Sequence, residues 1–139
     1  MSEVAGYVVC LDVGDRRIGV ALASTIARLP APLTTVDRDD IDGLVQLLKQ
    51  QDASLVVIGL PRDINGRQTE QTVKTQNFAE ALAKRINLPI VWQDESVTSI
   101  KAEERLQSRG VDYTKADIDA ESAVIILEDY LTNTHRRTA

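Results

Sequence analysis

The sequence lacks most of the residues from which cysteine-based and histidine-based sites are built. Its single cysteine, Cys10, stands in an apolar run, so we expect neither a disulfide framework nor a zinc cluster. Its single histidine, His135, stands in a polar C-terminal segment, which leaves little basis for histidine catalysis or a histidine-bound metal. One unpaired cysteine is typical of a reducing compartment, and we expect a cytoplasmic protein.

Long apolar runs and an excess of basic residues are also absent. Apolar runs such as residues 55–60 are too short to span a bilayer, and Met1-Ser2-Glu3 lacks the basic start and apolar core of a signal peptide. The chain has 16 Lys and Arg against 21 Asp and Glu, a net charge of −5, whereas binding to free nucleic acid normally draws on a basic surface. Bound cations can offset the charge of an active site made of carboxylates.

The residues that are present predict one α/β domain covering residues 1–139. The length of 139 residues and the apolar content of 43% suit a single soluble domain with one core. Apolar periodicity predicts strands at 7–11, 17–23, 33–36, 54–59 and 89–92, and helices at about 40–50, 70–87, 98–110 and 117–131. The polar residues 132–139 are expected to form a disordered tail.

The order of these elements predicts a mixed five-stranded sheet flanked by helices. The first three strands are separated by short turns, so they are expected to pair antiparallel. Each of the last two strands follows a helix, so both are expected to run parallel to the first strand.

Three carboxylates stand at the ends of these elements. Asp12 directly follows a β-rich run, although acidic residues are depleted in strands and burying a charge costs several kcal/mol unless it is paired. Glu95 follows the last strand, at the edge where α/β proteins place their sites, and only Glu95 or its neighbour Asp94 can face that edge. Asp119 lies in the first turn of the last helix, which stabilises an anion.

Each carboxylate taken alone has an ordinary explanation: a turn, a solvated loop, or a charge at a helix start. Taken together, Asp12, Glu95 and Asp119 are expected to gather at one edge of the sheet. Carboxylate oxygens suit Mg²⁺ or Mn²⁺, and two such ions can activate water against a phosphodiester without a nucleophilic side chain. The sequence therefore predicts a metal-dependent phosphodiesterase.

Four segments resemble the YqgF family of RuvX-type pre-16S rRNA nucleases and Holliday junction resolvases. Residues 12–21, DVGDRRIGVA, look like its opening D-x-G-x-x-R-I-G-V-A, and residues 59–66 carry a G-L-P followed by N-G. Asp94-Glu95 resembles its D-E-R motif, and residues 119–127 resemble its closing D-x-x-A-A-x-x-I-L helix. The similarity covers nearly the whole chain with the motifs in the same order.

This resemblance implies a ribonuclease H-like fold with Asp12, Glu95 and Asp119 as catalytic, metal-binding residues. It also implies a nucleic-acid substrate: the 5′ end of pre-16S ribosomal RNA first, with possible ribosome association, and branched DNA second. The chain departs from the family at Ser96, where an arginine is usual, and at 121–123, ESA, where small residues are usual. These departures concern substrate contacts more than the metal site.

Three arginines are candidates for phosphate contacts. Arg17 matches the family arginine, and the alternative is a structural ion pair with Asp15 or another carboxylate. Arg62 and Arg67 belong to a loop in which Gly66 permits close backbone approach. The sequence leaves a monomer and a homodimer open, although symmetric cutting of a four-way junction requires two active sites.

Two other functions compete with a nuclease. Actin-, Hsp70- and sugar-kinase-like ATPases share Asp12-x-Gly14, but they enclose nucleotide with a second domain that 139 residues do not supply. A non-catalytic module that binds RNA or a ribosome-associated partner is favoured by the acidic charge and Ser96, and disfavoured by the three retained carboxylates.

Overall fold

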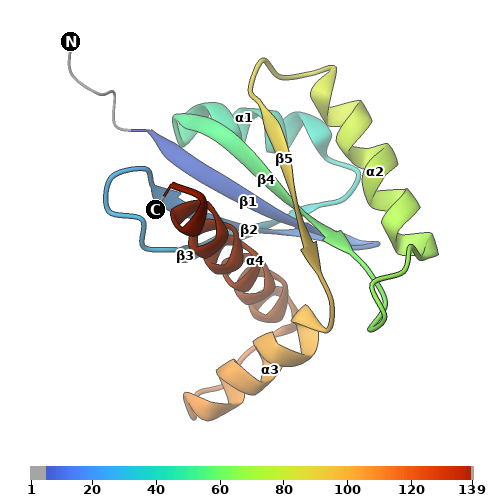
Figure 1. Cartoon of the computed structure of the whole chain (residues 1–139), viewed down its shortest axis with the longest axis vertical. Coiled ribbons are helices and arrows are strands. Elements are labelled where there is room, and N and C mark those ends of the chain that lie inside the picture. Colours follow the sequence, from blue (N-terminus) through green and yellow to red (C-terminus); the bar gives the residue numbers. More distant parts are fainter. Residues whose placement is uncertain (1–5, 139) are drawn as a thin grey trace.

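A computed structural model describes residues 6–138, with side chains described as far as residue 134 (Figure 1). The N-terminal residues 1–5 and the side chain of His135 therefore lie outside the described part. The elements are β1 (Tyr7–Val13), β2 (Arg17–Ser24), β3 (Ala31–Asp37), α1 (Ile41–Gln50), β4 (Ala53–Pro61), α2 (Glu70–Ala83), β5 (Ile90–Glu95), α3 (Thr98–Ser108) and α4 (Lys115–Thr138).

The five strands form one mixed sheet in the order β3-β2-β1-β4-β5. The pairs β1–β2 and β2–β3 are antiparallel, whereas β1–β4 and β4–β5 are parallel, which confirms the predicted pairing. The carboxyl ends of β1, β4 and β5 consequently meet at one edge. Asp12 pairs with Gly19 across β1 and β2, and Glu95 pairs with Pro61 across β4 and β5.

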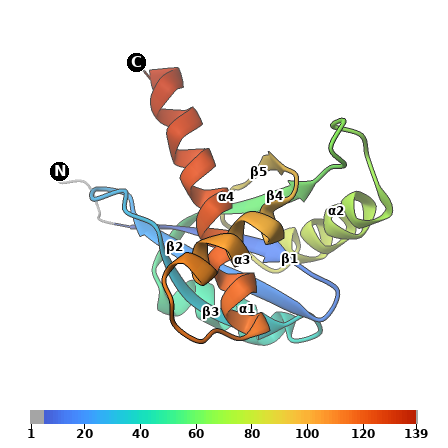
Figure 2. The same cartoon turned by 90° about the horizontal axis from the view of Figure 1, so that it is seen from below.

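Helices cover both faces of the sheet, α1 and α2 on one and α4 on the other (Figures 1 and 2). The alternation of side chains along β1 shows how the sequence builds these layers. Val9 and Leu11 enter the core beneath α1 and α2, while Val8 and Cys10 enter the core beneath α4. The same alternation directs Asp12 towards α4.

Helix α4 comes close enough to the sheet to touch its backbone. A Cβ atom on Gly19 of β2 would lie 1.9 Å from the backbone oxygen of Asp119, so only glycine permits this crossing. The position of α4, and with it the position of Asp119, therefore depends on a glycine at residue 19 of β2.

Helix α3 packs on α4 and extends beyond the edge of the sheet (Figure 1). An ion-pair network joins the two helices. Glu121 is 2% exposed, and the guanidinium groups of Arg105 and Arg109 donate to both of its oxygens at 3.1–3.2 Å. Arg105 also donates to Glu128 at 3.0–3.1 Å. The glutamate that departs from the family pattern thus pairs with arginines of the neighbouring helix.

Helix boundaries differ from the sequence prediction in α2 and α4. Helix α2 ends at Ala83 instead of near residue 87, and α4 begins at Lys115 instead of residue 117. Helix α3 begins at Thr98 as predicted, directly after Val97, whose φ of 50° is left-handed. Helix α4 continues to Thr138, where the sequence predicts a disordered tail from residue 132. Contacts with other elements hold α4 where the predicted tail begins, since Arg28 donates to the Leu131 carbonyl and Asn133 donates to Gln93. No helix among the described residues is long and apolar enough to cross a membrane.

Candidate active site

The three predicted carboxylates line the same cleft, which has a volume of about 470 Å³ and lies at the carboxyl ends of β1, β4 and β5. Asp12 comes from β1 and Glu95 from the end of β5. Asp119 comes from the second turn of α4 and not from the first turn as the sequence predicts, because the helix begins at Lys115, two residues earlier than expected. Gly14, Gly59 and the start of α3 complete the walls. The parallel pairing of β1, β4 and β5 explains the first two positions, and the crossing of α4 over Gly19 explains the third.

Asp12 carries a perturbed carboxyl group. Burial, followed by repulsion from Asp119, raises its pKa to about 6, and the nearby Ser122 hydroxyl partly offsets the rise. The Ser122 hydroxyl is itself fully buried and, among the described side chains, has no hydrogen-bond partner of ordinary geometry. The cleft therefore brings two carboxylates together without neutralising the charge of Asp12.

Asp119 is paired with Arg17. The Arg17 Nε atom donates to Asp119 Oδ2 at 2.7 Å, and both side chains are about one-third exposed. Of the two roles that the sequence leaves open for Arg17, the structure shows an ion pair, and its partner is Asp119. Asp15 instead lies 3.7 Å from the ammonium group of Lys74.

Glu95 faces α4, whereas Asp94 faces away from it. Val91 packs beneath α4, so alternation along β5 directs Glu95 to the same side, while exposed Asp94 lies 3.4 Å from Arg62. Glu95 accepts a hydrogen bond from Thr98 at 3.1 Å and shares another with Asp129 of α4. Burial, together with Asp129, raises the pKa of Glu95 well above its usual range.

Sequence reasoning missed Asp129. A helical face repeats at intervals of three and four residues, so Asp119, Ser122, Ile126 and Asp129 lie along one side of α4. Ser122 and Asp119 act on Asp12, Ile126 lines the cleft, and Asp129 contacts Glu95. This helical spacing is the sequence signal that could have identified Asp129. Without it, Asp129 cannot be told apart from an acidic residue on a solvated helix face.

The donor atoms in the cleft suit a divalent cation, although they are not gathered as a complete ligand set. Asp12 and Asp119 face one another closely enough to raise the pKa of Asp12, and a cation between them would relieve that repulsion. Within residues 6–134, no three acidic, His or Cys side chains lie close enough together to hold one metal ion. Glu95 lines the same cleft, and its carboxyl group interacts with Asp129.

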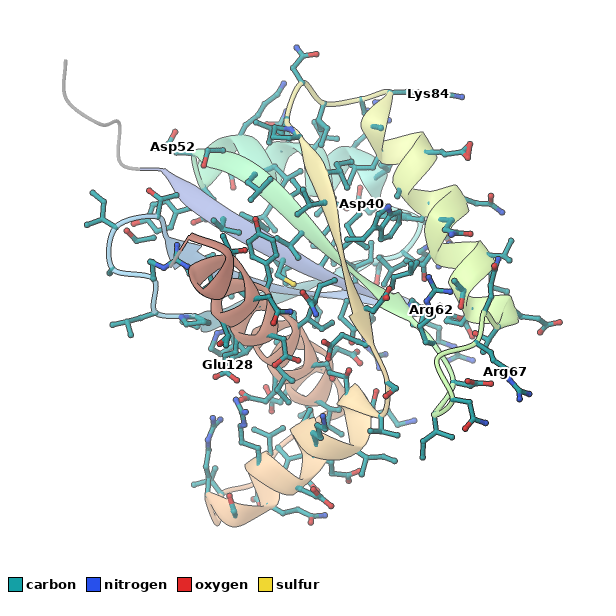
Figure 3. All side chains as sticks on the ribbon, viewed as in Figure 1. Asp40, Asp52, Arg62, Arg67, Lys84 and Glu128 are labelled. Atoms are coloured by element: carbon teal, nitrogen blue, oxygen red, sulfur yellow. The ribbon has the colours of Figure 1, made fainter. Side chains whose placement is uncertain are left out.

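The three candidate phosphate-binding arginines have different positions. Arg17 is held by Asp119, and Arg62 lines the cleft. Arg67 is exposed on the β4–α2 loop, farther from the strands than Arg62, and does not line the cleft (Figure 3). Asp63 shapes this loop by accepting hydrogen bonds from the backbone of residues 65 and 67. Ser96 lines the cleft where the family has arginine.

The chain is similar to proteins of known family and fold. It matches the RuvX family, described as a Holliday junction resolvase, over residues 6–133. A protein of Chloroflexus aurantiacus (strain J-10-fl), named "Putative pre-16S rRNA nuclease", is 40% identical over 130 residues, which are 89% of this chain and 85% of the relative. A protein of the same name from Gloeothece citriformis is 39% identical over 127 residues, 87% and 84% of the two chains.

Two solved structures share the fold at low sequence identity. Thermus thermophilus RuvC in complex with a Holliday junction has a TM-score of 0.55 at 13% identity, over 92% of this chain and 96% of that one. The fowlpox virus resolvase bound to junction DNA has a TM-score of 0.55 at 10% identity, over 92% and 98%. The fold is therefore the ribonuclease H-like fold of these resolvases, which confirms the prediction.

Proposed function

The chain belongs to the RuvX family, and we propose that it is a metal-dependent nuclease that hydrolyses phosphodiester bonds with Asp12, Glu95 and Asp119. The observation that carries the proposal is the meeting of three carboxylates, far apart in the sequence, in one cleft. Structural ion pairs seldom leave an aspartate such as Asp12 buried next to a second carboxylate, and perturbed groups of this kind are concentrated at functional sites.

Asp12 and Asp119 are the residues that would hold the cation, with Glu95 completing the site. Mg²⁺ or Mn²⁺, when bound, would activate water and stabilise the departing oxygen. Asp12 must lose its proton to act as a ligand, so cation binding releases a proton below about pH 6. Asp129 interacts with Glu95 on the α4 side of the sheet and so positions the carboxyl group where it lines the cleft.

The proposed substrate is the 5′ end of pre-16S ribosomal RNA, with four-way DNA junctions second. The names of the two relatives favour the RNA, and the net charge of −5 disfavours unaided binding of a broad, highly charged junction. A substrate held on a ribosomal particle needs less intrinsic affinity, because other contacts raise its effective concentration. The junction remains the second candidate because the family is described as a resolvase.

The first prediction tests this function with purified protein and Mn²⁺. A precursor-end RNA and a synthetic four-way junction are supplied at equal concentration, and cutting is followed on denaturing gels. We expect RNA cutting that Asp12→Asn lowers more than about 100-fold, since even outer partners of metal ligands contribute 10–100-fold. Asp39→Asn is the matched control, since it changes an exposed acid between β3 and α1 that does not line the cleft.

Three other outcomes would change the conclusion. Symmetric junction cutting that depends on Asp12, without RNA cutting, would reverse the order of the two substrates, and a dimeric solution mass would support that reversal. Activity that survives exhaustive chelation would refute the metal-dependent mechanism. Binding of RNA or ribosomal particles without any cutting would favour the non-catalytic module, which Ser96 and the acidic charge support.

A further inference from the structure

Two smaller hollows extend the carboxylate cleft on either side. A hollow of about 250 Å³ between α3 and the start of α4 shares Ser99 and Asp119 with the cleft. A hollow of about 220 Å³ at the β4–α2 loop shares Arg62 and Glu95 with it. Because the neighbouring hollows have walls in common, the three form one groove that crosses the sheet edge, with the carboxylates in the middle.

Basic side chains line both ends of this groove. Lys115 and Arg17 line the end next to α4, together with Glu103. Arg62 lines the other end, together with Asp63 and Asp94, so only the α4 end has more than one cation. Arg17 and Arg62 each lie within ion-pair distance of an aspartate. Lys115 is exposed, and no carboxylate among the described side chains lies within ion-pair distance of its ammonium group.

Both acids that line this hollow already have partners, and that of Asp119 is Arg17. Glu103 lines the same hollow and accepts a hydrogen bond from the Tyr113 hydroxyl at 3.0 Å. The Lys115 ammonium group is therefore the cation of the groove with the fewest competing contacts, and an ammonium on a flexible stem binds phosphate well.

The wall formed by the start of α3 is apolar and exposed. Ile100 is 58% exposed and Val97 is 46% exposed, and both border the carboxylate cleft. Exposed aliphatic side chains beside cations suit a ligand with phosphates along one side and apolar rings along the other. A polynucleotide strand has this chemistry. The phosphate at which the strand is cut has a neighbouring backbone phosphate on each side.

We propose that the groove holds a single polynucleotide strand, and that Lys115 binds the backbone phosphate on the α4 side of the phosphate that is cut. This inference rests on the proposed nuclease function and extends it to the path of the substrate. The carboxylates receive the reacting phosphate, Lys115 and Arg62 receive its neighbours, and Ile100 packs against a nucleoside between them.

The second prediction measures binding separately from cutting. A fluorescent single-stranded oligoribonucleotide is titrated with protein at several salt concentrations, with Ca²⁺ replacing Mg²⁺ and Mn²⁺. We expect Lys115→Gln to weaken binding several-fold at low salt and to reduce the slope of log K against log salt by about 0.7, the value for one phosphate contact on a single strand. Lys115→Arg, which keeps the charge, should retain most of the affinity.

Lys84→Gln is the matched control. It removes the same charge from an exposed lysine just beyond the end of α2, remote from the groove (Figure 3). We expect its affinity and salt slope to equal those of the unaltered protein, because the lost charge lies outside the strand path.

The possible results separate this inference from the proposed function. Equal RNA affinity of Lys115→Gln and Lys84→Gln, in a protein that still cuts RNA, would refute the assignment of the groove as the strand-binding site. It would leave the proposed nuclease function standing. Stronger binding of a duplex of the same length would overturn the single strand as occupant. Absence of both strand binding and cutting in the unaltered protein would refute the function and the groove together.

Discussion

The Asp12 carboxylate lies between the sheet and α4, where burial and a second carboxylate act on it in the same direction. Its pKa of about 6 means that the folded chain holds this proton more tightly than the unfolded chain, whose ordinary aspartate pKa is 3.8. A group of this kind lowers stability when it is ionised, so Asp12 is kept at a cost to the fold. A site for a cation explains why such a cost is tolerated.

The third prediction concerns the stability of Asp12→Asn in the presence of a chelator. Below about pH 4 the Asp12 carboxyl group of the unaltered protein carries its proton in both the folded and the unfolded state. Asp12 therefore does not lower the free energy of unfolding in this range. Between about pH 4 and pH 6 the unfolded chain loses its proton first, so stability falls as pH rises, and the loss of stability is complete above pH 6. Since one pKa unit corresponds to about 1.4 kcal/mol, Asp12→Asn should stabilise the fold by about 2–3 kcal/mol at pH 8.

Urea denaturation at pH 4 and pH 8 measures this difference. Asp15→Asn serves as the control, because Asp15 is exposed and its ion pair with Lys74 spans 3.7 Å at the surface. Destabilisation by Asp12→Asn at pH 8 would contradict the prediction, since it would mean that a protein group already neutralises the ionised carboxylate.

At the level of secondary-structure elements, two glycines decide how closely α4 lies against the sheet. A Cβ atom on Gly19 would meet the backbone of Asp119 at 1.9 Å, whereas one on Gly59 would meet the terminal carbon of Ile126 at 2.5 Å. A backbone cannot move away without shifting the whole helix, but the end of a side chain can change rotamer. The two positions therefore differ in consequence, although both are glycines in strands beneath α4.

The fourth prediction compares Gly19→Ala with Gly59→Ala. Overpacking against the α4 backbone should make Gly19→Ala destabilising by about 3 kcal/mol or more, and displacement of Asp119 should abolish cutting. Gly59→Ala should cost less than about 1.5 kcal/mol, because Ile126 can move. Chemical denaturation and the RNA assay measure the two effects, and equal destabilisation by both variants would show that α4 is not held by backbone contact at Gly19.

At the scale of the whole molecule, an acidic chain has to bind an acidic polymer. The net charge of −5 repels nucleic acid at long range, and the arrangement of cations at the two ends of the groove confines attraction to a few phosphates. Such a protein would select its substrate by whether a strand fits the groove and by whether the strand is brought to the groove on a larger particle. General affinity for phosphates would contribute little to the selection.

The fifth prediction is a shallow salt dependence. If Arg17, Arg62 and Lys115 make the phosphate contacts, log K for a single strand should fall against log salt with a slope of about −2. Fluorescence titrations of Asp12→Asn from low to physiological salt would measure this slope without cutting. A slope steeper than about −4 would show that basic side chains outside the groove take part in binding.

Local signals in the sequence were sufficient for much of the fold and for the placement of Asp12 and Glu95. Short turns and intervening helices predicted the antiparallel and parallel pairings, because chain connectivity restricts how neighbouring strands can meet. Asp12 and Glu95 could be placed at one edge for the same reason. Side-chain alternation along β5 then decides that Glu95, and not Asp94, faces α4.

Contacts between distant segments could not be predicted in this way. The left-handed Val97 before α3 follows from how that helix must leave β5 to reach α4, which no local propensity encodes. The helical conformation of α4 beyond Leu131 is likewise accompanied by contacts of Leu131 and Asn133 with Arg28 and Gln93, which are distant in the sequence. Both features involve packing between elements.

The sequence by itself determined the α/β class, the strand pairing and the placement of Asp12 and Glu95 at one edge of the sheet, because these depend on periodicity and on chain connectivity. Only the tertiary structure decided the partners of the three carboxylates. Arg17 and Asp119 are separated by 102 positions, and Asp129 reaches Glu95 only because α4 lies across the sheet over Gly19. Such pairings depend on where whole helices pack, and packing is a property of the assembled core.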